Sequence, residues 1–160
     1  SNRKMKVFID GRDSLASEVI VSAFNAACHI VLRPAVDATA LELQTLALEA
    51  DLIILDALPT AEATPRDIAH QFGVVSALRH TPFAGSKRIV LLSTVLTWAK
   101  LSVPGESEEG ETRGAVSEQH FARRAPLVGY LELRQLEDAV MRLRQVDDGK
   151  VLGGPGRVGA

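Results

Sequence analysis

The chain has 160 residues, of which 46% are hydrophobic and 24% charged, and its formal net charge is −2. This size and composition predict one soluble globular domain with a single core. The near-neutral charge gives no sign of a nucleic-acid or membrane partner, and the apolar runs are too short to span a bilayer. A lone cysteine, Cys28, excludes a disulfide framework and favours a reducing compartment.

Short apolar segments alternate with helical patterns from the start of the chain. Residues 6–10 predict a strand, and residues 15–27 predict a helix with one apolar stripe. Residues 29–34 predict a second strand. Asp37 is expected to cap a helix that runs to Ala50, because its carboxylate can accept hydrogen bonds from free backbone N–H groups.

The middle of the chain continues this alternation. The mostly apolar run at residues 51–58 is typical of a parallel strand that is buried on both faces. Pro65 is expected to begin a helix that runs to about His80, since proline suits the first helical turn. Residues 88–93 predict another buried strand, and the polar residues 103–115 predict a solvated loop.

The last third predicts a short helix at residues 117–124 and a longer one at 127–146. The longer helix has a buried stripe at Leu133, Leu136, Val140 and Leu143. Residues 150–152 are expected to open one more strand. Alternating strands and helices predict an α/β fold, a parallel sheet of about four to five strands with helices on both faces and the first strand central. Ligands of such sheets bind at the carboxyl ends of the strands.

Four segments, in order, resemble the extended short-chain dehydrogenase/reductase superfamily. V-F-I-D-G-R-D-S-L-A-S lies where that family has its glycine motif, with Gly11 retained and Ser14 and Ser17 at the other glycine positions. D-L-I-I-L-D-A-L is similar to the strand that ends near the nicotinamide ribose. K-R-I-V-L-L-S-T resembles the strand that carries the catalytic serine, and Y-L-E-L-R resembles Y-x-x-x-K with arginine replacing lysine. The resemblance covers residues 5–146 and implies a degenerate Rossmann-like domain.

A further similarity concerns the segment V-L-L-S-T-V-L-T-W-A-K. It resembles the corresponding segment in long adenylate kinases of motile cilia, in which a reductase-like domain precedes the kinase domain. The opening strand and the helix around Leu131, Glu137 and Val140 are also similar. This resemblance implies that residues 1–160 form a single Rossmann-like domain, that the C-terminal part of the fold is missing, and that the protein belongs to the axoneme.

The resemblance assigns roles to individual residues. In the reductases the tyrosine is the acid/base, the serine orients the carbonyl, and the lysine lowers the tyrosine pKa. Ser93, Tyr130 and Arg134 are therefore the vestigial catalytic candidates. The alternative interpretation makes Tyr130 a residue at the core edge and Arg134 a solvated one. The four histidines are scattered, with no spacing typical of metal ligands, so no metal is expected.

The candidate cofactor positions are Gly11, Ser14, Ser17 and Asp56. Glycines in this loop allow the backbone to approach a pyrophosphate, whereas serine side chains occupy that space and the carboxylate of Asp13 repels it. In the alternative interpretation Ser14 is only the N-cap of a helix. These defects predict weak binding, or none, of NAD and NADP.

Together these features predict a non-catalytic docking domain in an axonemal adenylate kinase-like protein of motile cilia or flagella. It would use no cofactor, and its partners would be other axonemal proteins, with no nucleic acid and no membrane. The alternatives are an active NAD(P)-dependent reductase or epimerase and a nucleotide-sensing domain. Residues 127–160 are expected to expose apolar surface that partner chains bury.

Overall fold

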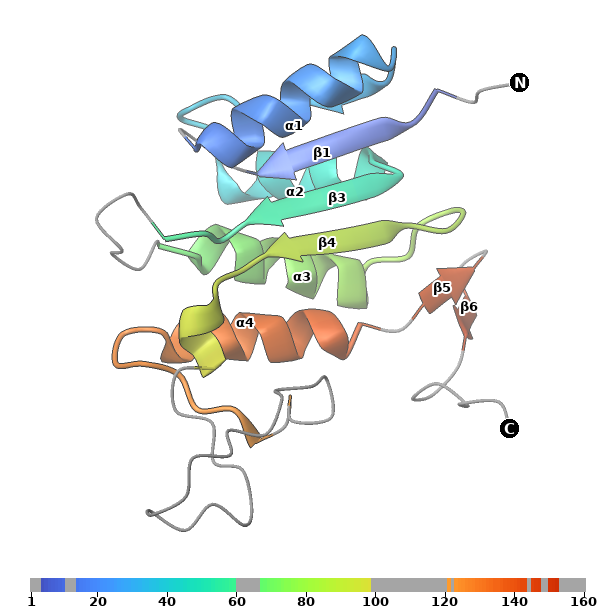
Figure 1. The fold of residues 1–160 in the computed structure, drawn as a ribbon. Coiled ribbons are helices and arrows are strands. Elements are labelled where there is room, and N and C mark those ends of the chain that lie inside the picture. The colour runs from blue at the N-terminus through green and yellow to red at the C-terminus, as the bar shows by residue number, and fades with distance from the viewer. Residues whose placement is uncertain are drawn as a thin grey trace, which may run out of the picture.

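Four parallel strands form the main sheet of this protein. A computed structural model describes residues 4–10, 14–59, 67–98, 121, 123–143, 145–147 and 150–152. The sheet has the order β2-β1-β3-β4, so the first strand is internal, as the sequence predicts. Figure 1 shows β1, β3 and β4 side by side in this order. Its strands are β1 (Lys6–Asp10), β2 (Ile30–Leu32), β3 (Leu52–Asp56) and β4 (Arg88–Leu92). The α/β prediction is therefore confirmed, as a Rossmann-like parallel sheet.

Helices cover both faces of this sheet. In Figure 1, α1 lies on the near face, while α2 and α3 lie behind the strands. A short 3-10 helix, η1, follows β4, and α4 packs against α3 and η1. The helices are α1 (Leu15–Ala26), α2 (Ala40–Glu49), α3 (Ala69–His80), η1 (Val95–Trp98) and α4 (Leu131–Met141).

The period-two alternation of each strand divides the core between the two faces. On the α2–α3 face, Phe8, Ile53 and Leu55 are fully buried and pack with side chains of α2, α3 and α4. On the α1 face, Val7 and Ile9 are fully buried beneath α1. The stripe predicted for the last helix is confirmed in part, because Leu133 and Leu136 are buried, while Val140 and Leu143 are partly buried against the same cluster.

The predicted cap of α2 was wrong. Asp37 lies in a turn, and Thr39 is the N-cap residue. The Thr39 hydroxyl accepts a hydrogen bond from the backbone N–H of Glu42, whose carboxylate accepts one from the backbone N–H of Thr39 in return. This reciprocal capping box satisfies two free donors, which a single aspartate cap does not.

Two other helix starts differ from the prediction. α3 begins at Ala69 instead of Pro65, because the Asp67 carboxylate accepts a hydrogen bond from the backbone N–H of Ala69 at 3.0 Å and holds a turn there. α4 begins at Leu131 instead of residue 127. Gly129 has φ +90°, a left-handed conformation that interrupts a helix.

The end of the chain also departs from the prediction. α4 stops at Met141, and β5 (Gln145–Asp147) pairs with β6 (Lys150–Leu152) as a separate antiparallel hairpin. Residues 150–152 therefore form a strand, but in the described part of the chain it does not extend the parallel sheet. The predicted loop at 103–115 and most of the predicted helix at 117–124 lie outside the described residues.

None of the helices in the described residues combines the length and the apolar character that crossing a membrane requires.

Candidate functional site

The first candidate site lies where β1 and β3 end. Chain order reverses between these two strands, which is the switch point where doubly wound sheets hold their ligands. The sequence places Gly11, Ser14, Ser17 and Asp56 here. Gly11 lies outside the described residues, and the structure brings the other three together.

These three residues bind one another instead of leaving an open cradle. Ser14 is the N-cap of α1 and accepts a hydrogen bond from the backbone N–H of Ser17 at 2.9 Å. The hydroxyls of Ser14 and Ser17 both donate to the same carboxylate oxygen of Asp56, the Ser17 bond at 2.9 Å. The backbone N–H of Leu58 donates to the other Asp56 oxygen at 3.0 Å. The Asp56 carboxylate thus receives three donors.

Burial makes this arrangement unfavourable for a phosphate group. Ser17 and Asp56 are fully buried, and Asp10, at the end of β1, is 5% exposed. A dinucleotide would bring two negative charges to a strand edge that already carries two buried carboxyl groups. The helix N–H group of Ser17, which could otherwise bind a phosphate, already donates to Ser14.

The second candidate site follows β4. Ser93 stands directly after this strand, as the resemblance to the catalytic serine requires. Its hydroxyl donates to the carboxylate of Glu137 on α4. Thr97 donates to the same oxygen at 3.0 Å. Ser93 is thus oriented toward an internal acid.

Arg124 completes a buried network around Glu137. Its Nε and Nη2 atoms donate to Oε2 of Glu137 at 3.0 and 2.8 Å, a bidentate ion pair, and Nη2 also donates to Asp138 at 3.1 Å. The guanidinium is 1% exposed and lies over the ring of Phe121, 3.4 Å from its centroid. Arginine is the cation that usually forms buried ion pairs of this kind and stacks on aromatic rings.

Tyr130 and Arg134 lie on one turn at the start of α4. The backbone N–H of Arg134 donates to the carbonyl of Tyr130 at 3.1 Å, so the predicted four-residue spacing places both on the helix. Tyr130 is 3% exposed and belongs to the core cluster behind the sheet. Arg134 is partly exposed, and its Nε atom is buried without a hydrogen bond within the described structure.

Sequence reasoning did not identify Arg124 and Thr97, and it used Glu137 only as part of a similarity. One feature of the sequence could have identified Glu137 as a buried acid. Glu137 directly follows Leu136 in the buried stripe of α4, and an acid in such a stripe needs a buried cationic partner. Nothing in the sequence indicated that Arg124, thirteen residues earlier, is that partner.

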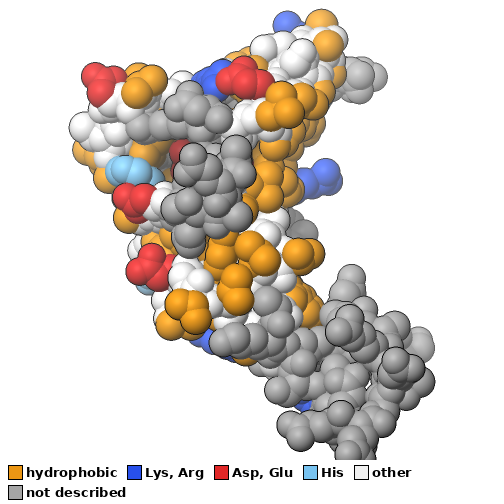
Figure 2. Space-filling view, turned by 60° about the vertical axis from the view of Figure 1, so that its left-hand side comes forward, with side chains coloured by type: hydrophobic (Ala, Val, Ile, Leu, Met, Phe, Trp, Pro, Cys, Tyr) orange, Lys and Arg blue, Asp and Glu red, His pale blue; other side chains and the backbone are white. Residues whose placement is uncertain are grey.

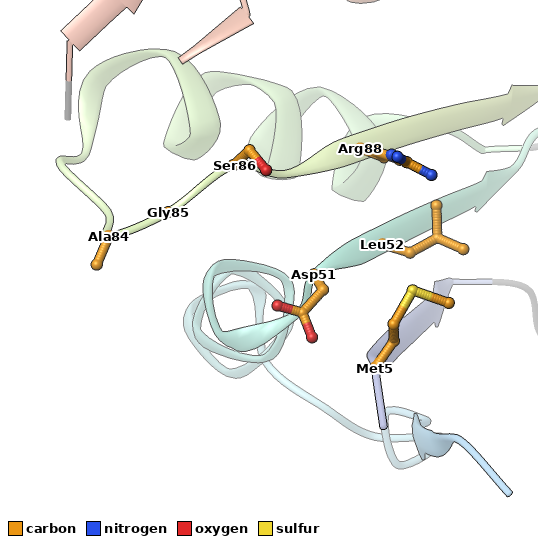
Figure 3. Close-up of a pocket in the computed structure, with 7 residues that line it drawn as sticks. All are labelled: Met5, Asp51, Leu52, Ala84, Gly85, Ser86 and Arg88. Carbon is orange, nitrogen blue, oxygen red and sulfur yellow. The ribbon is translucent and has the colours of Figure 1, made fainter. Parts of the chain in front are cut away.

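A pocket of about 430 Å³ lies at the opposite, amino end of the sheet (Figure 3). Leu52 and Met5 give it an apolar wall, and Asp51 and Arg88 give it opposite charges. Lys87, next to Arg88, donates hydrogen bonds to the carbonyls of Leu48 and Ala50 at the end of α2. Its burial lowers the pKa of its ammonium group, and the nearby Asp51 opposes that shift.

No group of three histidine, cysteine or acidic side chains that could hold a metal ion occurs among the described residues. No family model, curated protein or solved structure matches this chain.

Proposed function

We propose that this chain is a non-catalytic docking domain in the axoneme of a motile cilium or flagellum. The observation that carries the proposal is that the groups expected to do redox chemistry are engaged internally. Asp56 holds the hydroxyls of Ser14 and Ser17, and Glu137 holds the hydroxyl of Ser93. Releasing these buried bonds to bind a substrate would cost several hydrogen bonds to charged groups.

The location rests on resemblance alone. The segment V-L-L-S-T-V-L-T-W-A-K is similar to one in the reductase-like domain of adenylate kinase 7, a ciliary protein. Under this proposal the chain would position a larger protein among other axonemal proteins. It would use neither NAD nor NADP, and nucleic acid and membrane would not be its partners.

Exposed apolar side chains before and at the start of α4 offer a docking surface. Val128 is 85% exposed and Leu131 is 55% exposed, and Leu127 beside them is 40% exposed. Apolar groups that gather on a surface are typical of protein-binding sites. They lie within residues 127–160, where the sequence predicted uncovered apolar surface.

Co-sedimentation of the purified chain with demembranated axonemes tests the proposal. We expect saturable binding that the double variant Val128→Glu/Leu131→Glu weakens by about tenfold or more, because charges would enter an apolar contact. The matched control is Leu41→Glu, since Leu41 is 73% exposed on α2. Binding that is absent, or equally weakened by both changes, would contradict docking through this surface.

The reductase alternative makes the opposite prediction. An active enzyme would consume NADPH with a carbonyl substrate and would lose that activity in Tyr130→Phe and Ser93→Ala. A docking domain has no such turnover, and both variants would bind axonemes as the unchanged chain does. Substrate-dependent NADPH oxidation that these substitutions abolish would overturn the proposal.

A further inference from the structure

Among the residues that the structure describes, a helix lies over only half of the sheet face beneath α1. Within the described residues α1 is the only helix on this face, and it packs over β1 and β2. Val7 of β1 is fully buried there, whereas Val90 of β4 is 43% exposed. Parallel strands usually have both faces covered. The other half, over β3 and β4, we call the open half-face: Val90 is its exposed apolar residue, Leu52 and Leu92 are partly buried, and Ile54, which pairs with Val90, is 5% exposed.

The outer side of α1 is apolar as well as its inner side. Leu15 is 82% exposed and Val19 is 60% exposed, both on the side that points away from the sheet. Glu18 gives α1 a polar flank, but large exposed apolar side chains on the outer side of a helix are typical of a further contact. Figure 2, turned to bring the carboxyl ends of the strands forward, shows apolar side chains gathered down the α1 side of the molecule. The inner side packs against the sheet through Ile20, Val21 and Phe24.

We infer that this face is a homodimer interface, in which α1 of each copy covers the open half-face of the other. Packed helices lie about 8–10 Å apart, and neighbouring strands about 4.8 Å apart. A second helix beside α1 therefore lies about two strands away, over β3 and β4. A two-fold axis parallel to the strands, between the two helices, produces this contact in both copies at once.

Charge complementarity fits the same arrangement. A two-fold axis along the strands keeps the two α1 helices parallel, so each ends over the amino end of its partner's β4, where Arg88 stands. The last turn of α1 has no basic residue. Arg88 is exposed and forms no ion pair within the described residues. The partial negative charge of helix C-terminal carbonyls attracts such a cation.

The lengths of α1 and β4 are also compatible with this contact. α1 has 12 residues, which makes it about 18 Å long, and β4 has 5 residues, which span about 16 Å. Two adjacent helices on this face would cover about 18 by 20 Å. This footprint is roughly 360 Å² in projection, below the roughly 800 Å² of accessible surface per partner found in standard-size interfaces, which corresponds to a small contact. The pocket beside Arg88 and Leu52 would receive the helix end (Figure 3).

Small side chains line the flank where the two helices would meet. Glu18 forms an ion pair with Arg33, which follows β2, so that flank of α1 faces away from β4. Helical periodicity places Ala16 and Ala23, seven residues apart, on the opposite flank. A parallel pair would set each alanine against its own counterpart and allow close approach. Ala16 and Ala23 would therefore allow the two α1 helices to pack closely beside each other.

Sedimentation equilibrium of the 160-residue chain tests the inference, with circular dichroism to verify folding. We expect a dimer whose dissociation constant rises about 100-fold or more in Val90→Glu and in Val19→Lys, because each buries two unpaired charges per dimer. Mixing these two variants should restore dimers, since Val19 of one copy faces Val90 of the other. Leu41→Glu, on α2, is the matched control and should remain dimeric. A monomeric unchanged chain, or a dimer that neither variant weakens, would overturn the inference.

A cross-linking experiment tests the same contact without introducing a charge, so it remains informative if a charged variant fails to fold. In a Cys28→Ser background, Ala23→Cys should form an intermolecular disulfide across the axis, and Asn25→Cys on the opposite flank should not. Equal cross-linking of the two variants would contradict the parallel pair. The dimer does not depend on the proposed docking function. Val90→Glu should therefore still bind axonemes through Val128 and Leu131. A chain that dimerises but does not bind axonemes would contradict only the docking proposal, and a chain that binds axonemes but stays monomeric would contradict only the dimer.

Discussion

At the scale of single residues, the buried charged side chains form hydrogen bonds and ion pairs within the chain itself. Asp56 lies at the end of β3 and Glu137 lies on α4, and each accepts hydrogen bonds from this chain's own side chains. Ser14 and Ser93 were identifiable from the sequence by their positions after strands. Their partners were not, because long-range pairs such as Ser14 with Asp56 depend on how the strands are arranged.

The Glu137–Arg124 pair gives a stability prediction. Glu137→Ala would leave the guanidinium of Arg124, which is 1% exposed, buried without its bidentate partner. We expect a loss of about 3–5 kcal/mol in the free energy of unfolding, measured by urea denaturation. The double variant Arg124→Met/Glu137→Leu removes both charges and should lose less than Glu137→Ala alone. A loss below about 1 kcal/mol for the single variant would show that Arg124 finds water or another acid.

At the scale of elements, apolar periodicity predicted the strands well and the helix ends poorly. β1 has the predicted bounds, and β3 lies within the predicted run at residues 51–58, because polar residues bracket both apolar segments. The starts of α2 and α3 depend on side-chain bonds made by Thr39 and Asp67, which compete with the nearby Asp37 and Pro65. For the hairpin of β5 and β6, one short apolar run at residues 150–152 was the sole sequence feature that indicated a strand.

The capping box of α2 predicts a pH dependence. The backbone N–H of Thr39, followed by its hydroxyl, holds the pKa of Glu42 below the ordinary value of 4.5. A carboxyl group with a lowered pKa in the folded state stabilises the fold above its unfolded pKa, and that contribution is lost as the pH falls through the folded pKa. The stability difference between the unchanged chain and Glu42→Gln should therefore shrink between about pH 6 and pH 3. A difference that stays constant over this range, in thermal melts followed by circular dichroism, would show that the carboxylate contributes no charge-dependent stability.

At the scale of the whole molecule, the α/β class and the central position of β1 could be predicted from the sequence, because strict alternation of strands and helices permits few topologies. The uneven cover of the sheet by helices could not be predicted from the sequence. It depends on which helix packs on which face, and on the exposure of Val90 and Val19. In the described part of the chain, α2 and α3 lie on one face, while the other face has the open half-face. The proposed dimer contact and the proposed docking surface both depend on which side chains this packing leaves exposed.

Hydrogen bonds among Ser14, Ser17 and Asp56 fill the switch point between β1 and β3. Isothermal titration of the folded chain with NADPH and with NADH tests this most directly. We expect no binding tighter than a few hundred micromolar, since losing two or three bonds at about 1–2 kcal/mol each weakens a micromolar site by roughly several hundredfold. Ser14→Gly/Ser17→Gly should also fail to bind, because it leaves the Asp56 carboxylate facing the pyrophosphate. A dissociation constant near the micromolar range for the unchanged chain would contradict the account.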